Sequence, residues 1–207
     1  MANTEKTRDI ILKISEVLEE QKLFLSKLDA AIGDGDHGLN MAKGFGAAKE
    51  KLESSTFETP GELLKAVGMA LISKVGGAAG PLYGTAFLNA SKVIAGKEEL
   101  TLDDYKTMLG SALDGVKARG KAVVEEKTMV DAIEPAFHAL EEAIKNGDST
   151  RVAMDKAVDA AKAGVEFTKT IIAKKGRASY LGERSIGHED PGAMSSYMIL
   201  KTIAECF

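Results

Sequence analysis

The chain has 207 residues, of which 44% are hydrophobic and 28% charged, and its formal net charge is −4. These values are typical of a globular chain that buries a core without disulfides, and the single cysteine, Cys206, excludes an internal one. No basic cluster suits nucleic acid and no apolar run suits a signal peptide or a membrane span, so we expect a cytoplasmic protein with neither partner.

The first part of the chain carries apolar residues at helical spacing. This spacing predicts one long helix over residues 10–28 and a second over residues 41–52. Between them, the sequence GDGDHG at residues 33–38 predicts a tight loop. A third helix begins at the capping signal TPGE, residues 59–62, and runs to about Val75.

The rest of the chain predicts a glycine-rich loop, GGAAGPLYG at residues 76–84, and further helices. These are a fourth helix through Phe87 and Ile94, a fifth from Thr101 towards Gly120, a sixth from Thr128 to Asn146, a seventh from Thr150 to Gly176 and a last from Asp190. No stretch alternates as a strand does, and no repeat or linker marks a boundary. We therefore predict an all-α fold of about eight helices in a single domain over residues 1–207.

Three aspartates, Asp29, Asp34 and Asp36, fall within eight residues at the first loop. Magnesium prefers carboxylate oxygens, and the intervening glycines allow short side chains to converge, so the cluster indicates a magnesium site. Aspartate and glycine also form turns and cap helices, and the cluster alone leaves that structural role open. A calcium loop of the EF-hand type is excluded, because its fifth and twelfth positions would be Gly38 and Phe45.

Other features favour a phosphate ligand. His37 and Asn40 follow the aspartates at the start of a helix, and the glycine-rich loop offers backbone amides. Near the C-terminus an arginine-containing segment ends at Asp190, where the last helix begins and anions are favoured. Together these features predict Mg-nucleotide binding without a Walker motif.

Four blocks in order, GDGDHGLNM, GGAAGPLYGT, GKAVVEEKTM and KKGRASYLGERSIGHEDPGA, resemble the nucleotide-binding L subunit of bacterial dihydroxyacetone kinase. The resemblance implies a barrel of eight antiparallel helices with ADP or ATP at one end, held through two magnesium ions by Asp29, Asp34 and Asp36. It also implies that a further set of residues surrounds the nucleotide: His37, Gly38, Leu39, Asn40, Ala78, Ala79, Gly120, Met129, Arg177, Asp190, Pro191 and Gly192.

The same resemblance implies partners. A stand-alone subunit is similar to the version fed by the phosphoenolpyruvate phosphotransferase system, in which a phosphocarrier M subunit rephosphorylates a tightly held nucleotide. Dihydroxyacetone is bound covalently by a K subunit, so we assign no general base or other catalytic residue to this chain. The sequence leaves open whether the chain forms a homodimer.

Two regions depart from the family pattern, and in the second of them Glu126, which replaces an aspartate, keeps a carboxylate one methylene longer. Ala79 stands where relatives typically have serine, and Glu125 stands where relatives usually have glycine, which matters if that position requires a positive φ. These departures motivate a first alternative, a non-catalytic regulatory or adaptor paralogue. A second alternative is a magnesium-dependent phosphohydrolase.

Overall fold

The computed structural model describes residues 2–207, which form nine α-helices, one 3-10 helix and two short strands. In chain order the elements are β1 (Ala2–Asn3), α1 (Thr4–Glu20), α2 (Lys22–Ile32), α3 (His37–Glu53), α4 (Pro60–Lys74), α5 (Ala79–Val93), β2 (Glu99–Leu100), α6 (Leu102–Gly120), α7 (Val130–Lys145), α8 (Thr150–Thr168), η1 (Arg177–Ser185) and α9 (Pro191–Glu205).

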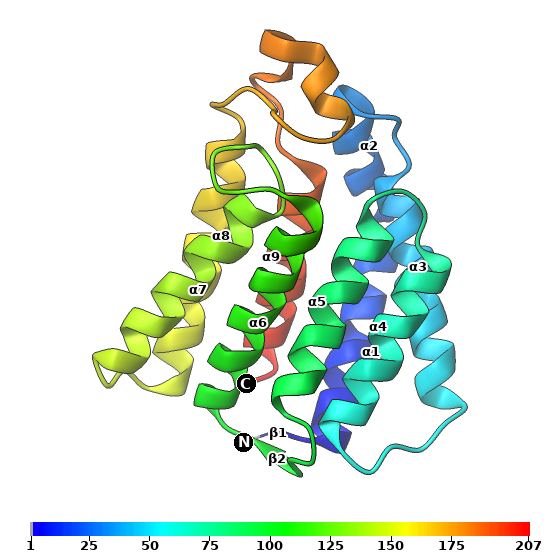
Figure 1. Cartoon of the computed structure of the whole chain (residues 1–207), viewed down its shortest axis with the longest axis vertical. Coiled ribbons are helices and arrows are strands. Elements are labelled where there is room, and N and C mark those ends of the chain that lie inside the picture. Colours follow the sequence, from blue (N-terminus) through cyan, green and yellow to red (C-terminus); the bar gives the residue numbers. More distant parts are fainter. Residues whose placement is uncertain (1) are drawn as a thin grey trace.

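Eight of the helices form a closed ring (Figure 1). Each helix from α3 to α9 contacts the next one along the chain, and α1 closes the ring by contacting both α3 and α9. The chain runs up and down around the ring, so α3, α5, α7 and α9 all begin at the same end, which we call the mouth (Figure 1). The predicted all-α barrel of eight antiparallel helices is confirmed.

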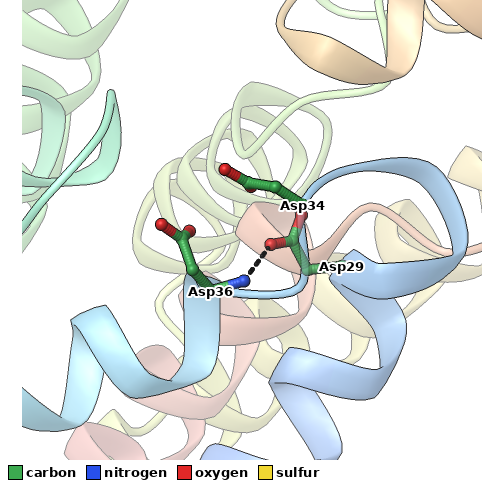
Figure 2. A group of neighbouring side chains, drawn as sticks. All are labelled: Asp29, Asp34 and Asp36. Atoms are coloured by element: carbon green, nitrogen blue, oxygen red, sulfur yellow. Dashed lines mark hydrogen bonds between the residues drawn. The ribbon is translucent and has the colours of Figure 1, made fainter.

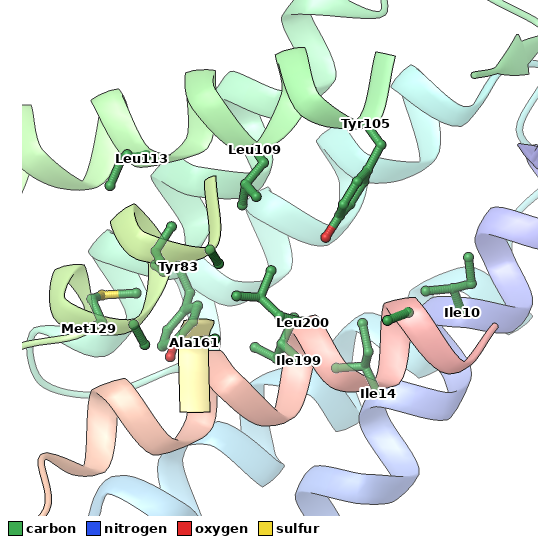
Figure 3. Close-up of a cluster of buried hydrophobic side chains, with 14 of the residues drawn as sticks. Ile10, Ile14, Tyr83, Tyr105, Leu109, Leu113, Met129, Ala161, Ile199 and Leu200 are labelled. Carbon is green, nitrogen blue, oxygen red and sulfur yellow. The ribbon is translucent and has the colours of Figure 1, made fainter. Parts of the chain in front are cut away.

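The core fills the inside of this barrel. Apolar side chains from facing helices, such as Ile14, Tyr83 and Leu200, are buried together (Figure 3). Burying one such aliphatic side chain contributes about 1.5–3 kcal/mol to folding. The packing leaves an apolar cavity of about 140 Å³ inside the barrel, with a lining that includes Met129 near the mouth and Leu100 at the opposite end. Within residues 2–207, no helix has the length and apolar character that crossing a membrane requires.

Local start signals predicted several helix ends correctly. Thr59 caps α4 through a hydrogen bond from the Glu62 amide, and Asp190 caps α9 through one from the Ala193 amide. Thr101 opens α6 with a full capping box. Such caps satisfy backbone amides that have no partner inside the helix, so their sequence signal is strong.

Other predicted boundaries were wrong. The long first helix is two, because Gln21 leaves helical geometry at ψ 3°, although no proline or glycine marks a kink there. The glycine-rich loop is short, since α5 already begins at Ala79. The segment expected to be irregular contains η1, and residues 2–3 and 99–100 pair as a two-stranded antiparallel ribbon at the end opposite the mouth (Figure 1).

The predicted seventh helix extends too far. α8 ends at Thr168 and not near Gly176. Its last residue forms hydrogen bonds with groups from other parts of the chain. The Thr168 carbonyl accepts from the ammonium group of Lys127, and the Thr168 hydroxyl accepts from the Asp190 amide at 3.0 Å. Residues distant in sequence therefore end this helix.

Candidate functional site

The three aspartates meet at the mouth (Figure 2). Asp29 lies on the last turn of α2, and Asp34 and Asp36 lie on the loop to α3. Each offers one carboxylate oxygen within 4.8 Å of the other two. Three oxygen donors so close together repel one another in the absence of a cation, and they match the ligand type that magnesium prefers.

Hydrogen bonds hold this loop around Asp29, whose exposed fraction is only 9%. Its Oδ2 accepts from the backbone amides of Asp36 at 2.9 Å and His37 at 3.0 Å. Gly33 is required at the bend, because a β-carbon there would overlap Asp29 Oδ1. The buried carboxylate is thus fixed before any ligand arrives, while Asp34 and Asp36 are exposed.

Arg177 joins the aspartate group from η1. Its Nη2 lies 2.9 Å from Asp34 Oδ2, with the two side chains 70% and 37% exposed. A solvent-exposed ion pair contributes roughly 0–1 kcal/mol, so this contact adds little to stability. Its consequence is positional: it places a guanidinium, which can bind phosphate oxygens in a bidentate manner, beside the carboxylates.

His37 begins α3 and connects it to α9. Its Nε2 lies 2.8 Å from the hydroxyl of Ser195, which is fully buried. Burial lowers the pKa of His37, although Asp29 and Asp36 act in the opposite direction. The imidazole is therefore neutral at pH 7 in the ligand-free protein.

The predicted glycine loop reaches the same end of the barrel. Ala78 is the N-cap of α5 and Ala79 is its first residue. A β-carbon on Gly76 would lie 3.0 Å from Oδ1 of Asn40, so the loop passes directly beside the first turn of α3. Gly38 and Leu39 occupy that turn, with Gly38 buried and Leu39 exposed.

The remaining predicted residues lie around α9 and its neighbours. A β-carbon on Gly192 would lie 3.6 Å from Cβ of Met129, which is the N-cap of α7 and is buried. Gly120 ends α6 and lies beside Leu82 of α5, so it is adjacent to the first turn of that helix. Pro191 is buried at the first position of α9.

Several of these residues stand at helix N-termini. α3, α5 and α9 begin at His37, Ala79 and Pro191 respectively, and all three starts face the mouth (Figure 1). The N-terminus of a helix carries partial positive charge and unpaired amides, so it favours an anion. The mouth therefore combines a cation-binding group of carboxylates with positive helix ends and Arg177.

Sequence reasoning missed a buried charged cluster below the mouth. Lys127 is 1% exposed and donates from Nζ to the backbone carbonyls of Thr168 and His188. Asp131 accepts from the amides of Glu125 and Thr128 and shapes the loop before α7. No local pattern marks a lysine whose partners lie 41 and 61 residues away.

Burial shifts the pKa values of Lys127 and Asp131 and of the neighbouring Asp190, which is one of the predicted site residues. It raises the pKa of Asp190 to about 7 and also raises that of Asp131, while it lowers the pKa of Lys127. The nearby opposite charges act against these shifts, because Lys127 favours the charged form of Asp190. Asp190 therefore titrates near neutral pH.

Residues 31–205 match the family model of the DAK2 domain. The chain is 41% identical over 194 residues to the ADP-binding subunit DhaL of the PEP-dependent dihydroxyacetone kinase of Escherichia coli, covering 94% of this chain and 92% of that one. It is 43% identical over 205 residues to the ADP-binding subunit DhaL of the PTS-dependent dihydroxyacetone kinase of Lactococcus lactis, covering 99% and 98%.

Solved structures agree. A crystal structure of the dihydroxyacetone kinase of C. freundii in complex with AMP-PNP and Mg²⁺ matches with a TM-score of 0.71 and 28% identity, over 99% of this chain and 34% of that one. The fold and the site are therefore those of a protein related to kinase subunits. The chain belongs to the DAK2 domain family, and its resemblance to the L subunits of bacterial dihydroxyacetone kinases is confirmed.

Proposed function

We propose that this chain binds ADP or ATP together with two magnesium ions at the mouth of the barrel, and that it transfers a phosphoryl group to dihydroxyacetone. The observation that carries the proposal is the convergence of Asp29, Asp34 and Asp36 within 4.8 Å at the mouth, where α3, α5, α7 and α9 begin. The named activity of the relatives, an ADP-binding subunit of a dihydroxyacetone kinase, supports it.

The proposed division of roles follows from the contacts. The three carboxylates would hold magnesium, which when bound neutralises charge on phosphate oxygens. Asp29 supplies a fixed anchor because two backbone amides already hold it. Arg177 sits at the exposed edge of the group, where its guanidinium can bind a phosphate oxygen.

The nucleotide would lie between the starts of α3, α5 and α9. Its proposed surroundings are the residues carried over from the family motifs: His37, Gly38, Leu39, Asn40, Ala78, Ala79, Gly120, Met129, Arg177, Asp190, Pro191 and Gly192. Backbone amides at these helix starts can donate to phosphate without a change of charge. No residue of this chain is proposed as a general base, since positioning and charge neutralisation supply most of the catalysis of phosphoryl transfer.

The proposed reaction needs two partner proteins in the cytoplasm. A K subunit would hold dihydroxyacetone, and a phosphocarrier M subunit of the phosphotransferase system would rephosphorylate the nucleotide in place. Two relatives support this scheme, because they are described as subunits of PEP-dependent and PTS-dependent dihydroxyacetone kinases.

Three measurements test the proposal. Mass spectrometry of the supernatant of denatured protein, purified without added nucleotide, should find ADP, and metal analysis should find two magnesium ions per chain. Reconstitution with the K and M subunits and phosphoenolpyruvate should yield dihydroxyacetone phosphate. Absence of nucleotide, together with no binding on addition, contradicts the proposal; binding without product indicates an adaptor, and steady phosphate release from ATP by this chain alone indicates a hydrolase.

A further inference from the structure

A buried serine holds the side chain of His37 from the opposite helix. Ser195 lies on α9, has an exposed fraction of 0% and places its Oγ 2.8 Å from His37 Nε2. The two residues are 158 positions apart in the sequence, so the contact exists only in the closed barrel. Ser195 is outside the set of residues that the sequence motifs assign to the nucleotide.

The surroundings of Ser195 settle which group donates. Its Oγ lies 3.0 Å from the carbonyl oxygen of Pro191 and 3.1 Å from that of Gly192. A carbonyl oxygen cannot donate a hydrogen bond, so the serine and carbonyl oxygens would repel each other unless a hydrogen lay between them. The Ser195 hydroxyl hydrogen therefore points towards the carbonyls. The hydrogen bond with His37 therefore has Nε2–H as the donor and Ser195 Oγ as the acceptor, an assignment that rests on the network.

Tyr83 of α5 completes the network. Its hydroxyl lies 2.7 Å from Ser195 Oγ and 2.7 Å from Ser196 Oγ, and the residue is 4% exposed. The Tyr83 hydroxyl also lies 3.1 Å from the carbonyl oxygen of Gly192. In the arrangement in which Tyr83 donates to Ser195, both lone pairs of the serine oxygen are used, one by Tyr83 and one by His37. A buried network with every partner satisfied resists rotation of its members.

His37 is consequently fixed at two points. Its backbone amide donates to Asp29 at 3.0 Å and its ring donates to Ser195. We propose that Ser195 is a positioning residue, which orients the His37 imidazole towards the bound nucleotide and thereby increases the affinity for Mg-ADP. This inference rests on the proposed function, because it requires that His37 contacts the nucleotide.

The first test is calorimetric titration of ADP, in magnesium chloride, into full-length protein stripped of nucleotide. Ser195→Ala should weaken binding by about 3- to 10-fold, the factor that corresponds to one net hydrogen bond. The matched control is Thr202→Val, which removes a buried hydroxyl from the same helix. Thr202 also donates to the carbonyl four residues earlier but lies about two helical turns from Ser195, so the affinity of Thr202→Val for ADP should stay within 2-fold of wild type.

A double-mutant cycle separates positioning from a general structural loss. If Ser195 acts through His37, Ser195→Ala should add no further loss of affinity in a His37→Ala background. The chain has only three histidines, so ¹⁵N-histidine labelling resolves the His37 ring. In wild type the Nε2 resonance should be that of a protonated nitrogen with a single ring orientation, and in Ser195→Ala it should broaden or shift.

The outcomes are distinguishable. Wild type that binds no Mg-ADP contradicts the proposed function, and the positioning role falls with it. Wild type that binds normally, with Ser195→Ala unchanged in affinity and in the His37 resonances, contradicts only the role of Ser195. An equal loss in the presence and absence of His37, or a loss matched by Thr202→Val, also overturns the inference, because the effect would then bypass the ring.

Discussion

Lys127 donates a hydrogen bond from its ammonium group to the carbonyl oxygen of His188, two residues before the N-cap of α9. The same group donates to the carbonyl of Thr168, at the end of α8. One buried side chain thus ties the loop before α7 to the turn that leads into α9. That turn carries Asp190, so the position of the α9 start depends on Lys127.

Lys127→Met should loosen this connection. Methionine fills a similar volume but leaves two carbonyls without their donor, which costs about 1–3 kcal/mol of unfolding free energy. Hydrogen exchange should become faster at the amides of residues 187–193, measured by mass spectrometry. Lys175→Met is the control, since Lys175 makes only a 3.7 Å surface pair with Glu126 and should change stability by less than about 1 kcal/mol. Unchanged hydrogen exchange in Lys127→Met would show that the turn before α9 does not depend on the hydrogen bonds from Lys127.

Asp34→Asn should abolish magnesium-dependent ADP binding and phosphoryl transfer while the helical circular dichroism stays unchanged. The Asp34 side chain is 37% exposed and forms an exposed ion pair with Arg177, so the fold loses at most about 1 kcal/mol. Asp29→Ala should abolish binding as well, but with a clear loss of stability, because it removes the oxygen that accepts two backbone amides. Calorimetry with and without magnesium measures the first effect and thermal unfolding the second. Wild-type affinity in Asp34→Asn would refute the metal assignment.

Glu125→Gly should leave stability unchanged or raise it by up to about 1 kcal/mol. Glu125 is exposed and has a φ of 66°, a region that non-glycine residues occupy at a cost and that glycine occupies freely. Glu126→Gly is the matched control and should be destabilising, because the Glu126 carboxylate accepts from the Val123 amide at 3.0 Å. Urea unfolding of both variants measures the difference. The reverse order of stabilities would mean that the strain at Glu125 is absent in solution.

The resemblance implies glycine at this position, and the positive φ of Glu125 gives a physical reason for a glycine there. The sequence departure raised the question of a positive φ, and Glu125 indeed adopts one. Glu125 therefore occupies a backbone conformation that glycine adopts freely. This departure gives no support to a loss of function in the chain.

How much the sequence could predict depends on the range of each interaction. Helix starts at Thr59 and Asp190 were predicted because cap and amide lie three residues apart. The convergence of Asp29 with Asp34 and Asp36 could be anticipated for the same reason, since a tight loop separates them. Local spacing carries these features directly.

Long-range contacts explain what the sequence could not predict. The end of α8 depends on Lys127 and on the Asp190 amide, both distant in the chain. The network of Tyr83 and Ser195 around His37 joins three helices of the ring, and its residues read individually as ordinary core or helix positions. Only closure of the barrel brings such groups together.

The protonation of Asp190 should make the free energy of unfolding depend on pH. Burial raises its pKa to about 7, from an ordinary value near 3.8, so the folded protein binds this proton more tightly than the unfolded chain does. The unfolding free energy therefore falls as pH rises from about 4 to about 7, and it stays lower above pH 7. Asp190→Asn cannot titrate, and its amide oxygen can still accept from Ala193.

We therefore expect Asp190→Asn and wild type to differ in unfolding free energy by an amount that grows with pH. Relative to the difference at pH 4, the variant should gain on the order of 1–4 kcal/mol by pH 8, measured by urea unfolding without magnesium or nucleotide. Asp155→Asn is the matched control, because Asp155 is a 49% exposed side chain on α8 paired with Arg151, and its effect should stay within about 1 kcal/mol throughout. A difference for Asp190→Asn that is constant from pH 4 to pH 8 would mean that Asp190 is already ionised at pH 4, and that Lys127 compensates fully for its burial.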